Sequence, residues 1–258
     1  MNKAAMRTLD ILTYVSGSRR PVTPKAISEA LNIPLAGTND ILDTMVRMEY
    51  LMQPDKGVRA FAVGIRAFEA GAAYIQGADL LKAAKPYLRE MSRETKATAF
   101  LAVRNKDKIV YLDKVEGSAA VITTAQLGSS KDMYNTGLGK AILASMPVAE
   151  VERIYEGREL IPQTSNTIRD IEGLKKDLFQ TRQRGYAIDD CEGENTVYCI
   201  AAPIRNYEGN VIAAVSIANF KENGRQAENA EHVRLLLDNA RRISGQMGYT
   251  GKDLYYKE

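Results

Sequence analysis

The chain has 258 residues, of which 45% are hydrophobic and 26% charged, and its formal net charge is +3. This length suits two ordinary domains, and the composition is that of a globular protein with a sizeable core. No uncharged apolar run approaches the roughly eighteen residues of a membrane span, and the N-terminus lacks a signal-peptide core, so we expect a cytoplasmic protein with no membrane partner.

Few residues could hold a metal or perform covalent catalysis. The chain has two cysteines, Cys191 and Cys199, and a single histidine, His232. This inventory is too small for a Cys/His zinc site, and a structural disulfide is not expected in a reducing compartment. We therefore expect no metal, no cofactor and no catalytic residue. A redox sensor that uses the two cysteines stays open as an alternative.

The segment 1–64 predicts three helices followed by a hairpin. Apolar residues recur at helical spacing in three stretches, 5–16, 24–31 and 36–48. Thr23 is a good N-cap for the second helix because Pro24 then takes its first position. Two short strands, 50–52 and 58–63, flank the turn Pro54–Gly57. Three helices with a two-stranded wing are typical of a winged helix-turn-helix, a DNA-binding domain.

Helical spacing continues over 65–77, and after Gly77 a further helix carries Leu81, Leu88 and Met91. We expect 65–77 to be a helical linker between two domains.

From Thr98 onward the pattern changes to short runs rich in β-branched and aromatic residues. These runs predict strands at 98–105, 109–117, 119–128, 198–204 and 209–220. Helices are predicted at about 138–146, 148–156 and 170–184, with a last helix marked by Val233 and Ile243. Consecutive hairpins with helices outside them indicate an α+β fold with an antiparallel sheet over 78–248, followed by a flexible tail at 249–258.

Three stretches of the chain resemble the IclR family of bacterial transcription regulators. They are NIPLAGTNDILDTMVRMEYL at 32–51, MYNTGLGKAILA at 133–144, and RGYAIDDCEGENTVYCIAAPIRNYEGNVIAAVSIANF at 184–220. The resemblance implies a winged helix-turn-helix joined to a GAF-like effector domain. It also implies a homodimer formed through the N-terminal domains, often a dimer of dimers, and operator DNA binding that changes with a small carboxylate effector.

The effector site is expected around the helix that begins near Gly137. Backbone amides at a helix start attract anions, and glycine lets a carboxylate approach closely, although a glycine-rich start can also be only a tight turn. On the family pattern, the amides of Gly137 and Leu138 take the effector carboxylate. The other positions that match the family's pocket are Ala120, Thr123, Asp189, Val197, Cys199 and Ser216. An ionised Asp189 only accepts hydrogen bonds, so we expect it to favour monocarboxylates that carry a hydroxyl.

The recognition helix carries unusual charges. It has no Lys or Arg from Leu35 to Val46, and residues 1–75 as a whole hold nine basic residues against seven acidic ones. Carboxylates are repelled by phosphates. One explanation is that Thr38 and Asn39 read base edges and Asp40 accepts from cytosine, while the phosphates are held by Arg19, Arg20, Lys25, Lys56 and Arg59. The other is weakened DNA affinity, which leaves a ligand-sensing or partner-binding protein.

Two hypotheses from other functional classes, an enzyme and an interaction module, stay open. An enzyme on the effector fold would use Cys199 and Asp189, but the sequence offers no nearby base and orienting partner. A pure interaction module would use the winged domain for dimerisation only. We expect a regulator and not an enzyme.

Overall fold

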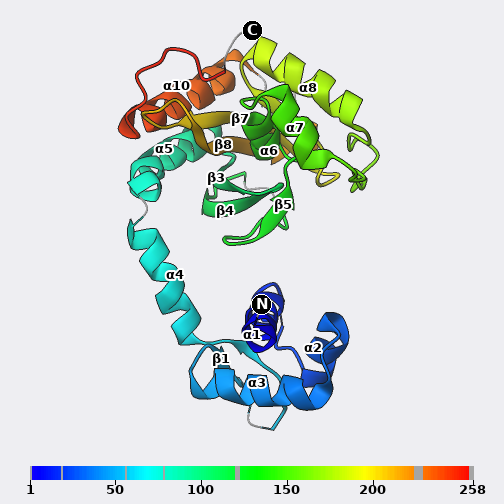
Figure 1. Cartoon of the computed structure of the whole chain (residues 1–258). Helices are drawn as coiled ribbons and strands as arrows, with labels where there is room; N and C mark the ends of the chain where they lie inside the picture. The colour runs from blue at the N-terminus through cyan, green and yellow to red at the C-terminus, as the bar shows by residue number, and fades with distance from the viewer. Residues whose placement is uncertain are drawn as a thin grey trace. The chain divides into compact units, whose positions relative to one another are not determined.

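The computed structural model describes residues 2–18, 20–55, 57–77, 79–119, 123–223 and 229–255, and the chain forms two compact units, Met1–Ala78 and Asp79–Glu258 (Figure 1). They are called here the N-terminal and the C-terminal unit. Within the described residues, no helix is long and apolar enough to cross a membrane.

The N-terminal unit has the predicted winged helix-turn-helix order. Its helices are α1 (Lys3–Ser16), α2 (Pro24–Leu31) and α3 (Leu35–Arg47), and its wing is β1 (Leu51–Met52) paired with β2 (Ala62–Val63). The Thr23 hydroxyl accepts a hydrogen bond from the amide of Ala26 and caps α2 as expected. Asn32, in the left-handed conformation, ends α2 and turns the chain into α3.

The wing is shorter than the sequence pattern predicts. Only two residues of each strand pair, and the backbone of Phe61 instead exchanges two hydrogen bonds with Val22. Phe61 is also buried in the core of the unit, which comprises Ile11, Val15, Ile27, Ile33, Leu42, Met45, Leu51 and Phe61. The wing is therefore fixed to the segment between α1 and α2.

Helix α4 (Ile65–Gly77) occupies the residues expected for the linker, and α5 (Asp79–Thr95) begins the C-terminal unit. The six strands of this unit are β3 (Thr98–Asn105), β4 (Lys108–Val115), β5 (Ser130–Asp132), β6 (Ala187–Asp190), β7 (Val197–Arg205) and β8 (Val211–Phe220). They form an antiparallel sheet in the order β5-β4-β3-β8-β7-β6, so β5 and β6 are its two edges.

Helices cover both faces of this sheet (Figure 1). One face is covered by α5 and α10 (Ala230–Gln246), and the other by α6 (Gly137–Leu143), behind which lie α7 (Val148–Tyr155) and α8 (Ile171–Arg184). The short helix η1 (Lys221–Asn223) follows β8. The predicted α+β class, with an antiparallel sheet, is confirmed.

Three details differ from the sequence predictions. In place of a strand at 119–128, the described residues 123–128 form turns and the edge strand β5 follows them; residues 120–122 lie outside the described part. Strand β6 was not predicted. The segment 249–258, expected to be a flexible tail, packs back onto the unit as far as residue 255: Leu254 and Tyr255 are buried in the core, and the Leu254 carbonyl accepts a hydrogen bond from Arg205.

Candidate functional site

A small pocket lies between the sheet and the beginning of α6. Antiparallel pairing places Asp189 opposite Cys199 and Ser216 opposite Phe100, so these side chains share the sheet face that α6 covers. Seven of the eight expected effector-site residues line this pocket: Thr123, Gly137, Leu138, Asp189, Val197, Cys199 and Ser216. The eighth, Ala120, lies outside the described residues.

The pocket is nearly filled by its own side chains. Its volume is about 30 Å³, roughly the space that one water molecule occupies in the liquid. Pockets that hold small ligands usually measure about 300–1,000 Å³. The walls must therefore separate before a metabolite can enter.

Ser216 brings an unused hydrogen-bonding group to this pocket. The residue is 1% exposed, and its hydroxyl has no hydrogen-bond partner among the described residues. Burying a hydroxyl in this way costs about 1–3 kcal/mol. A ligand oxygen within reach would remove that cost, so Ser216 is suited to bind a polar ligand.

Asp189 is the carboxylate of the pocket. It is buried, and its Oδ1 accepts a hydrogen bond of 2.7 Å from the amide of Glu192. Burial raises the pKa of Asp189 to about 6, against the opposing effect of the Lys140 ammonium and of the hydrogen bonds that the carboxylate accepts. Asp189 can therefore change its charge state near neutral pH.

Cys199 is a neutral thiol beside this carboxylate. Its sulfur lies 3.8 Å from Asp189 Oδ2, and burial together with Asp189 raises the pKa of the thiol well above its ordinary value. The nucleophilic form of cysteine is the thiolate. Cys199 therefore lines the pocket with a weak hydrogen-bonding group, and its neutral thiol is a poor nucleophile.

The two glycines that begin α6 serve different purposes. A Cβ at Gly139 would lie 2.3 Å from the backbone of Met133, so packing alone requires glycine there. A Cβ at Gly137 would make only ordinary contacts, at 3.5 Å from the Ala201 side chain and 3.6 Å from that of Asp189. Packing therefore leaves Gly137 unexplained, and the residue lines the pocket.

A buried ion cluster behind the pocket was not predicted from the sequence. Lys140 on α6 is 1% exposed; its ammonium donates to Glu192 and lies 3.2 Å from the carboxylate of Asp177 on α8. Burial disfavours the ammonium, but the two carboxylates more than offset this and raise the pKa of Lys140. The cluster ties α6 and α8 to the turn after Asp189. A single lysine within the apolar run GLGKAIL was the available signal.

The recognition helix α3 requires one correction. Thr38, expected to read bases, is fully buried, and its hydroxyl donates to the Pro34 carbonyl oxygen at 3.2 Å. It anchors the beginning of α3 and cannot reach a base edge. Asn39 is half-buried and Asp40 is exposed, so both side chains lie on the solvent-facing side of α3.

The expected phosphate contacts are placed unevenly. Arg19 and Lys56 lie outside the described residues, whereas Arg20 and Lys25 are exposed. The Lys25 ammonium lies 3.9 Å from the Glu29 carboxylate. Arg59 in the wing forms an exposed ion pair of 2.8 Å with Asp43 of α3. An acidic residue of the recognition helix thus partly neutralises a basic residue of the wing.

Both halves of the chain match models of one family. The model described as the IclR helix-turn-helix domain matches residues 4–55, and the model described as the bacterial transcriptional regulator IclR C-terminal domain matches residues 72–245. The chain belongs to the IclR family. It is a transcriptional regulator with a C-terminal effector-binding domain.

Relatives and solved structures of this family align over nearly the whole chain. The HTH-type transcriptional regulator KdgR of Escherichia coli is 33% identical over 237 residues, which cover 90% of this chain and 88% of that protein. The Thermotoga maritima IclR structure has a TM-score of 0.76 at 27% identity and covers 95% of this chain and 98% of that one. An IclR homolog from Microbacterium hydrocarbonoxydans in complex with 4-hydroxybenzoate has a TM-score of 0.80 at 23% identity, with coverage of 95% and 99%.

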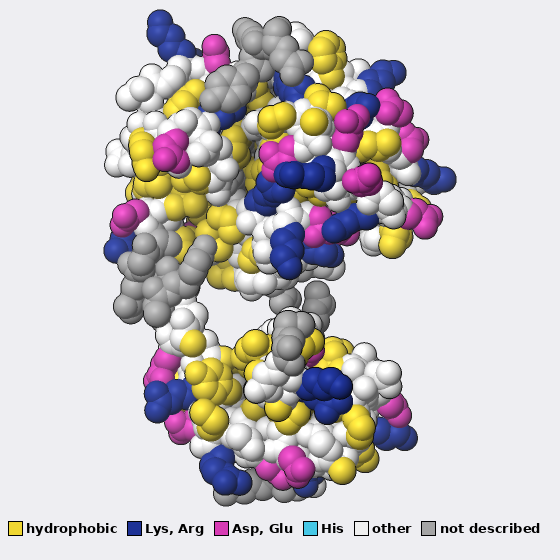
Figure 2. Space-filling view, viewed as in Figure 1, with side chains coloured by type: hydrophobic (Ala, Val, Ile, Leu, Met, Phe, Trp, Pro, Cys, Tyr) yellow, Lys and Arg dark blue, Asp and Glu magenta, His cyan; other side chains and the backbone are white. Residues whose placement is uncertain are grey.

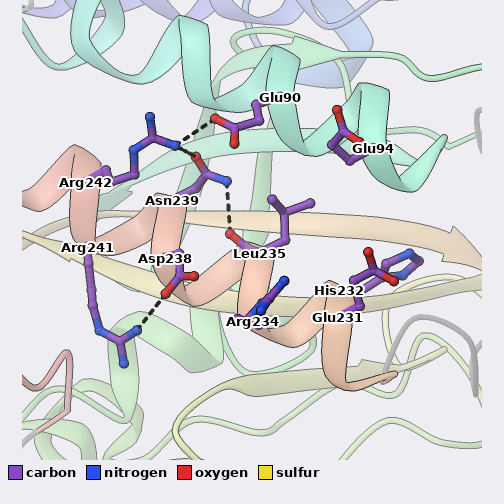
Figure 3. A pocket seen from close by; sticks show the side chains of 10 residues that line it. All are labelled: Glu90, Glu94, Glu231, His232, Arg234, Leu235, Asp238, Asn239, Arg241 and Arg242. Carbon is purple, nitrogen blue, oxygen red and sulfur yellow. Dashed lines mark hydrogen bonds and ion pairs between the residues drawn. The ribbon is translucent and has the colours of Figure 1, made fainter.

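A second, larger hollow of about 710 Å³ lies between α5 and α10, on the sheet face away from the IclR-type pocket. Figure 3 shows charged side chains of both signs around it, and Arg242 and Arg241 pair with Glu90 and Asp238. His232 lies at one end, half-buried. The described residues contain no cluster of side chains suited to a metal ion.

Proposed function

We propose that the chain regulates transcription by binding operator DNA through its N-terminal unit, and that a small carboxylate metabolite in the C-terminal pocket modulates this binding. The effector is a monocarboxylate that also carries a hydroxyl or keto oxygen. It lies beside the amides of Gly137 and Leu138, with its second oxygen at Ser216. The unpartnered, fully buried hydroxyl of Ser216 carries this proposal.

The charge of Asp189 supports the choice of a monocarboxylate. A second carboxylate next to a buried aspartate would be repelled, whereas a hydroxyl can donate to it. The ligand of the Microbacterium homolog, 4-hydroxybenzoate, has one carboxylate and one hydroxyl. That relative is similar to this chain in fold, and its ligand suggests only the chemical class.

A regulator is favoured over an enzyme by the state of the thiol. The raised pKa of Cys199 keeps it protonated, and His232 lies on α10, on the other face of the sheet. The relative KdgR is described as an HTH-type transcriptional regulator.

A homodimer, assembled into a dimer of dimers, is the proposed form on DNA. Exposed hydrophobic side chains occur on the N-terminal unit (Figure 2), and Leu9 on α1 and Ile65 and Phe68 on α4 are each more than half exposed. Apolar side chains that gather at a surface mark contact sites between proteins. Light scattering on the purified chain measures the assembly, and a monomer at micromolar concentration would exclude it.

A sensing or partner-binding protein with weak DNA affinity is the second candidate function. The Arg59–Asp43 ion pair favours it, because it leaves the wing with less charge for phosphate. A gel shift with the intergenic DNA upstream of the chain's own gene, at low salt, separates the two. A saturable shift supports the regulator, and no shift with or without acids supports the second candidate.

Isothermal titration with small acids tests the ligand class. We expect lactate, pyruvate or 4-hydroxybenzoate to bind more tightly than succinate, and Ser216→Val to weaken binding by roughly tenfold through its lost hydrogen bond. A preference for dicarboxylates would contradict the proposal.

A further inference from the structure

The outer end of the pocket is closed by a set of polar contacts around one carboxylate. Glu194 Oε1 accepts hydrogen bonds from the hydroxyls of Thr123 at 2.9 Å and Thr124 at 2.7 Å, and from the Lys131 ammonium at 3.0 Å. Lys131 also donates to the Thr124 hydroxyl at 2.8 Å. These four residues are called the latch. Both Lys131 and Glu194 line the pocket, and neither was predicted from the sequence.

The latch connects the two edges of the sheet. Lys131 lies on β5 at one edge, and Glu194 lies in the turn that follows β6 at the other. The strands between them carry the pocket face, so the contact between Lys131 and Glu194 spans the pocket. Their side chains are 25% and 21% exposed, whereas Ser216 is 1% exposed, which places the latch on the solvent side.

The charges of the latch are balanced within it. Burial opposes ionisation of Glu194, but the hydrogen bonds from Thr124 and Lys131 more than offset this and hold its pKa below the ordinary value. The ionised Glu194 therefore neutralises Lys131. An anionic ligand that reaches the latch meets a cation that is already occupied.

We infer that Glu194 is an internal carboxylate that keeps the pocket closed by binding Lys131, and that the effector carboxylate, which lies beside the amides of Gly137 and Leu138, displaces Glu194 from this lysine. The inference rests on the proposed function, because it assumes an acidic effector in this pocket. It adds Lys131 as the residue that selects anions and Glu194 as the residue that sets the cost of opening. A pocket of about 30 Å³ must open to admit any metabolite, and the apparent affinity is the affinity of the open form multiplied by the fraction of molecules that are open.

Two substitutions separate opening from charge. Glu194→Gln and Lys131→Met both break the ion pair and open the pocket, but only Glu194→Gln leaves the lysine free for a ligand anion. Glu150→Gln is the matched control, because Glu150 pairs with Arg104 at 2.9 Å with similar exposure and does not line the pocket.

Thiol labelling measures opening without any effector. Cys199 is buried in the pocket, so its rate of reaction with methyl methanethiosulfonate, followed by mass spectrometry of the Cys199 peptide, reports access. We expect Glu194→Gln and Lys131→Met to raise this rate roughly tenfold, since each loses a charge-assisted contact, and Glu150→Gln to leave it unchanged. An unchanged rate in both latch variants would overturn the closing role.

Calorimetry with pyruvate and with its neutral analogue pyruvamide tests the competition. We expect Glu194→Gln to bind pyruvate several-fold more tightly than the unsubstituted chain, and Lys131→Met to show no such gain although its pocket is open. Pyruvamide, which needs no cation, should bind both variants alike. If Lys131→Met gains as much pyruvate affinity as Glu194→Gln, the role of Lys131 is refuted. If neither the chain nor its variants bind any acid, the acidic effector and the competition fail together, while the labelling rates still decide the closing role.

Discussion

Replacing Lys140 by methionine should destabilise the C-terminal unit strongly. The substitution keeps an unbranched apolar side chain, one atom shorter than that of lysine, but removes the cation from Glu192, whose side chain is 7% exposed, and from Asp177. Breaking a buried pair by removal of one partner costs about 3–5 kcal/mol. A domain of this size loses about 2–4 °C of melting temperature per kcal/mol. We therefore expect the transition of this unit to fall by roughly 6–20 °C.

The loss should depend on pH in a defined direction. Burial raises the pKa of Glu192 to about 7, against the opposing effect of the Lys140 ammonium. Without Lys140 this pKa rises further above its value in the unfolded chain, so the ionised form is the one that opposes folding. The destabilisation is then largest at pH 8 and shrinks as the pH falls and Glu192 takes up a proton. Calorimetric melting of the full chain at pH 8 and pH 5 measures both effects.

Lys175 provides the matched control. Its ammonium also contacts two carboxylates, those of Glu152 at 2.8 Å and Glu172 at 3.0 Å, but at the protein surface. We expect Lys175→Met to leave the melting temperature unchanged. A Lys140→Met variant that melts within about 4 °C of the unsubstituted chain, equivalent to about 1 kcal/mol, would refute the structural importance of the buried cluster.

Three further predictions concern the pocket and the recognition helix. Asp43→Asn frees Arg59 for a phosphate, so DNA affinity should rise and the salt dependence of binding, measured by anisotropy, should steepen by about 0.9 per added contact; unchanged affinity and slope would exclude this role. Because burial raises the pKa of Asp189 to about 6, this carboxyl is mostly neutral at pH 5, and pyruvate should bind more tightly there than at pH 8. Asp189→Asn should flatten this pH dependence, and calorimetry that finds tighter binding at pH 8 would contradict the prediction. Thr38→Val should cost about 1 kcal/mol of stability through its lost bond to Pro34 and leave the preferred DNA sequence unchanged in a binding-site selection, whereas a changed preference would mean that this side chain reaches the bases.

Local patterns were sufficient to predict most of the fold. Strand β3 has the predicted bounds of 98–105, and α2 those of 24–31, because β-branched runs and a capped amphipathic segment carry their signal within a few residues. Strand β6 was missed because it has only four residues and ends in two aspartates. The burial of Leu254 and Tyr255 depends on a docking surface far away in the sequence, which no local pattern reports.

Only part of the candidate site could be predicted, because its remaining contacts join residues that are far apart in the sequence. The family resemblance supplied most of the pocket wall, including Asp189, Cys199 and Ser216, which strand register brings together. The ion pairs of Lys131 with Glu194 and of Lys140 with Glu192 join residues more than fifty positions apart, and charged residues in a sequence do not name their partners. The prediction that Thr38 reads bases was wrong because it rested on the hydrogen-bonding capacity of the hydroxyl alone. Thr38 lies on the buried face of α3.

Operator binding with and without a small acid tests the central claim most directly. Fluorescence anisotropy on the upstream intergenic DNA, with and without a saturating hydroxy monocarboxylate, gives the coupling between the two units. We predict a change of at least about fivefold in Kd, the lower range of measured allosteric couplings, and a smaller change at the same acid concentration in a Ser216→Val variant that still binds the DNA. An acid that binds the pocket by calorimetry but leaves the DNA affinity of the unsubstituted chain unaltered would contradict the account.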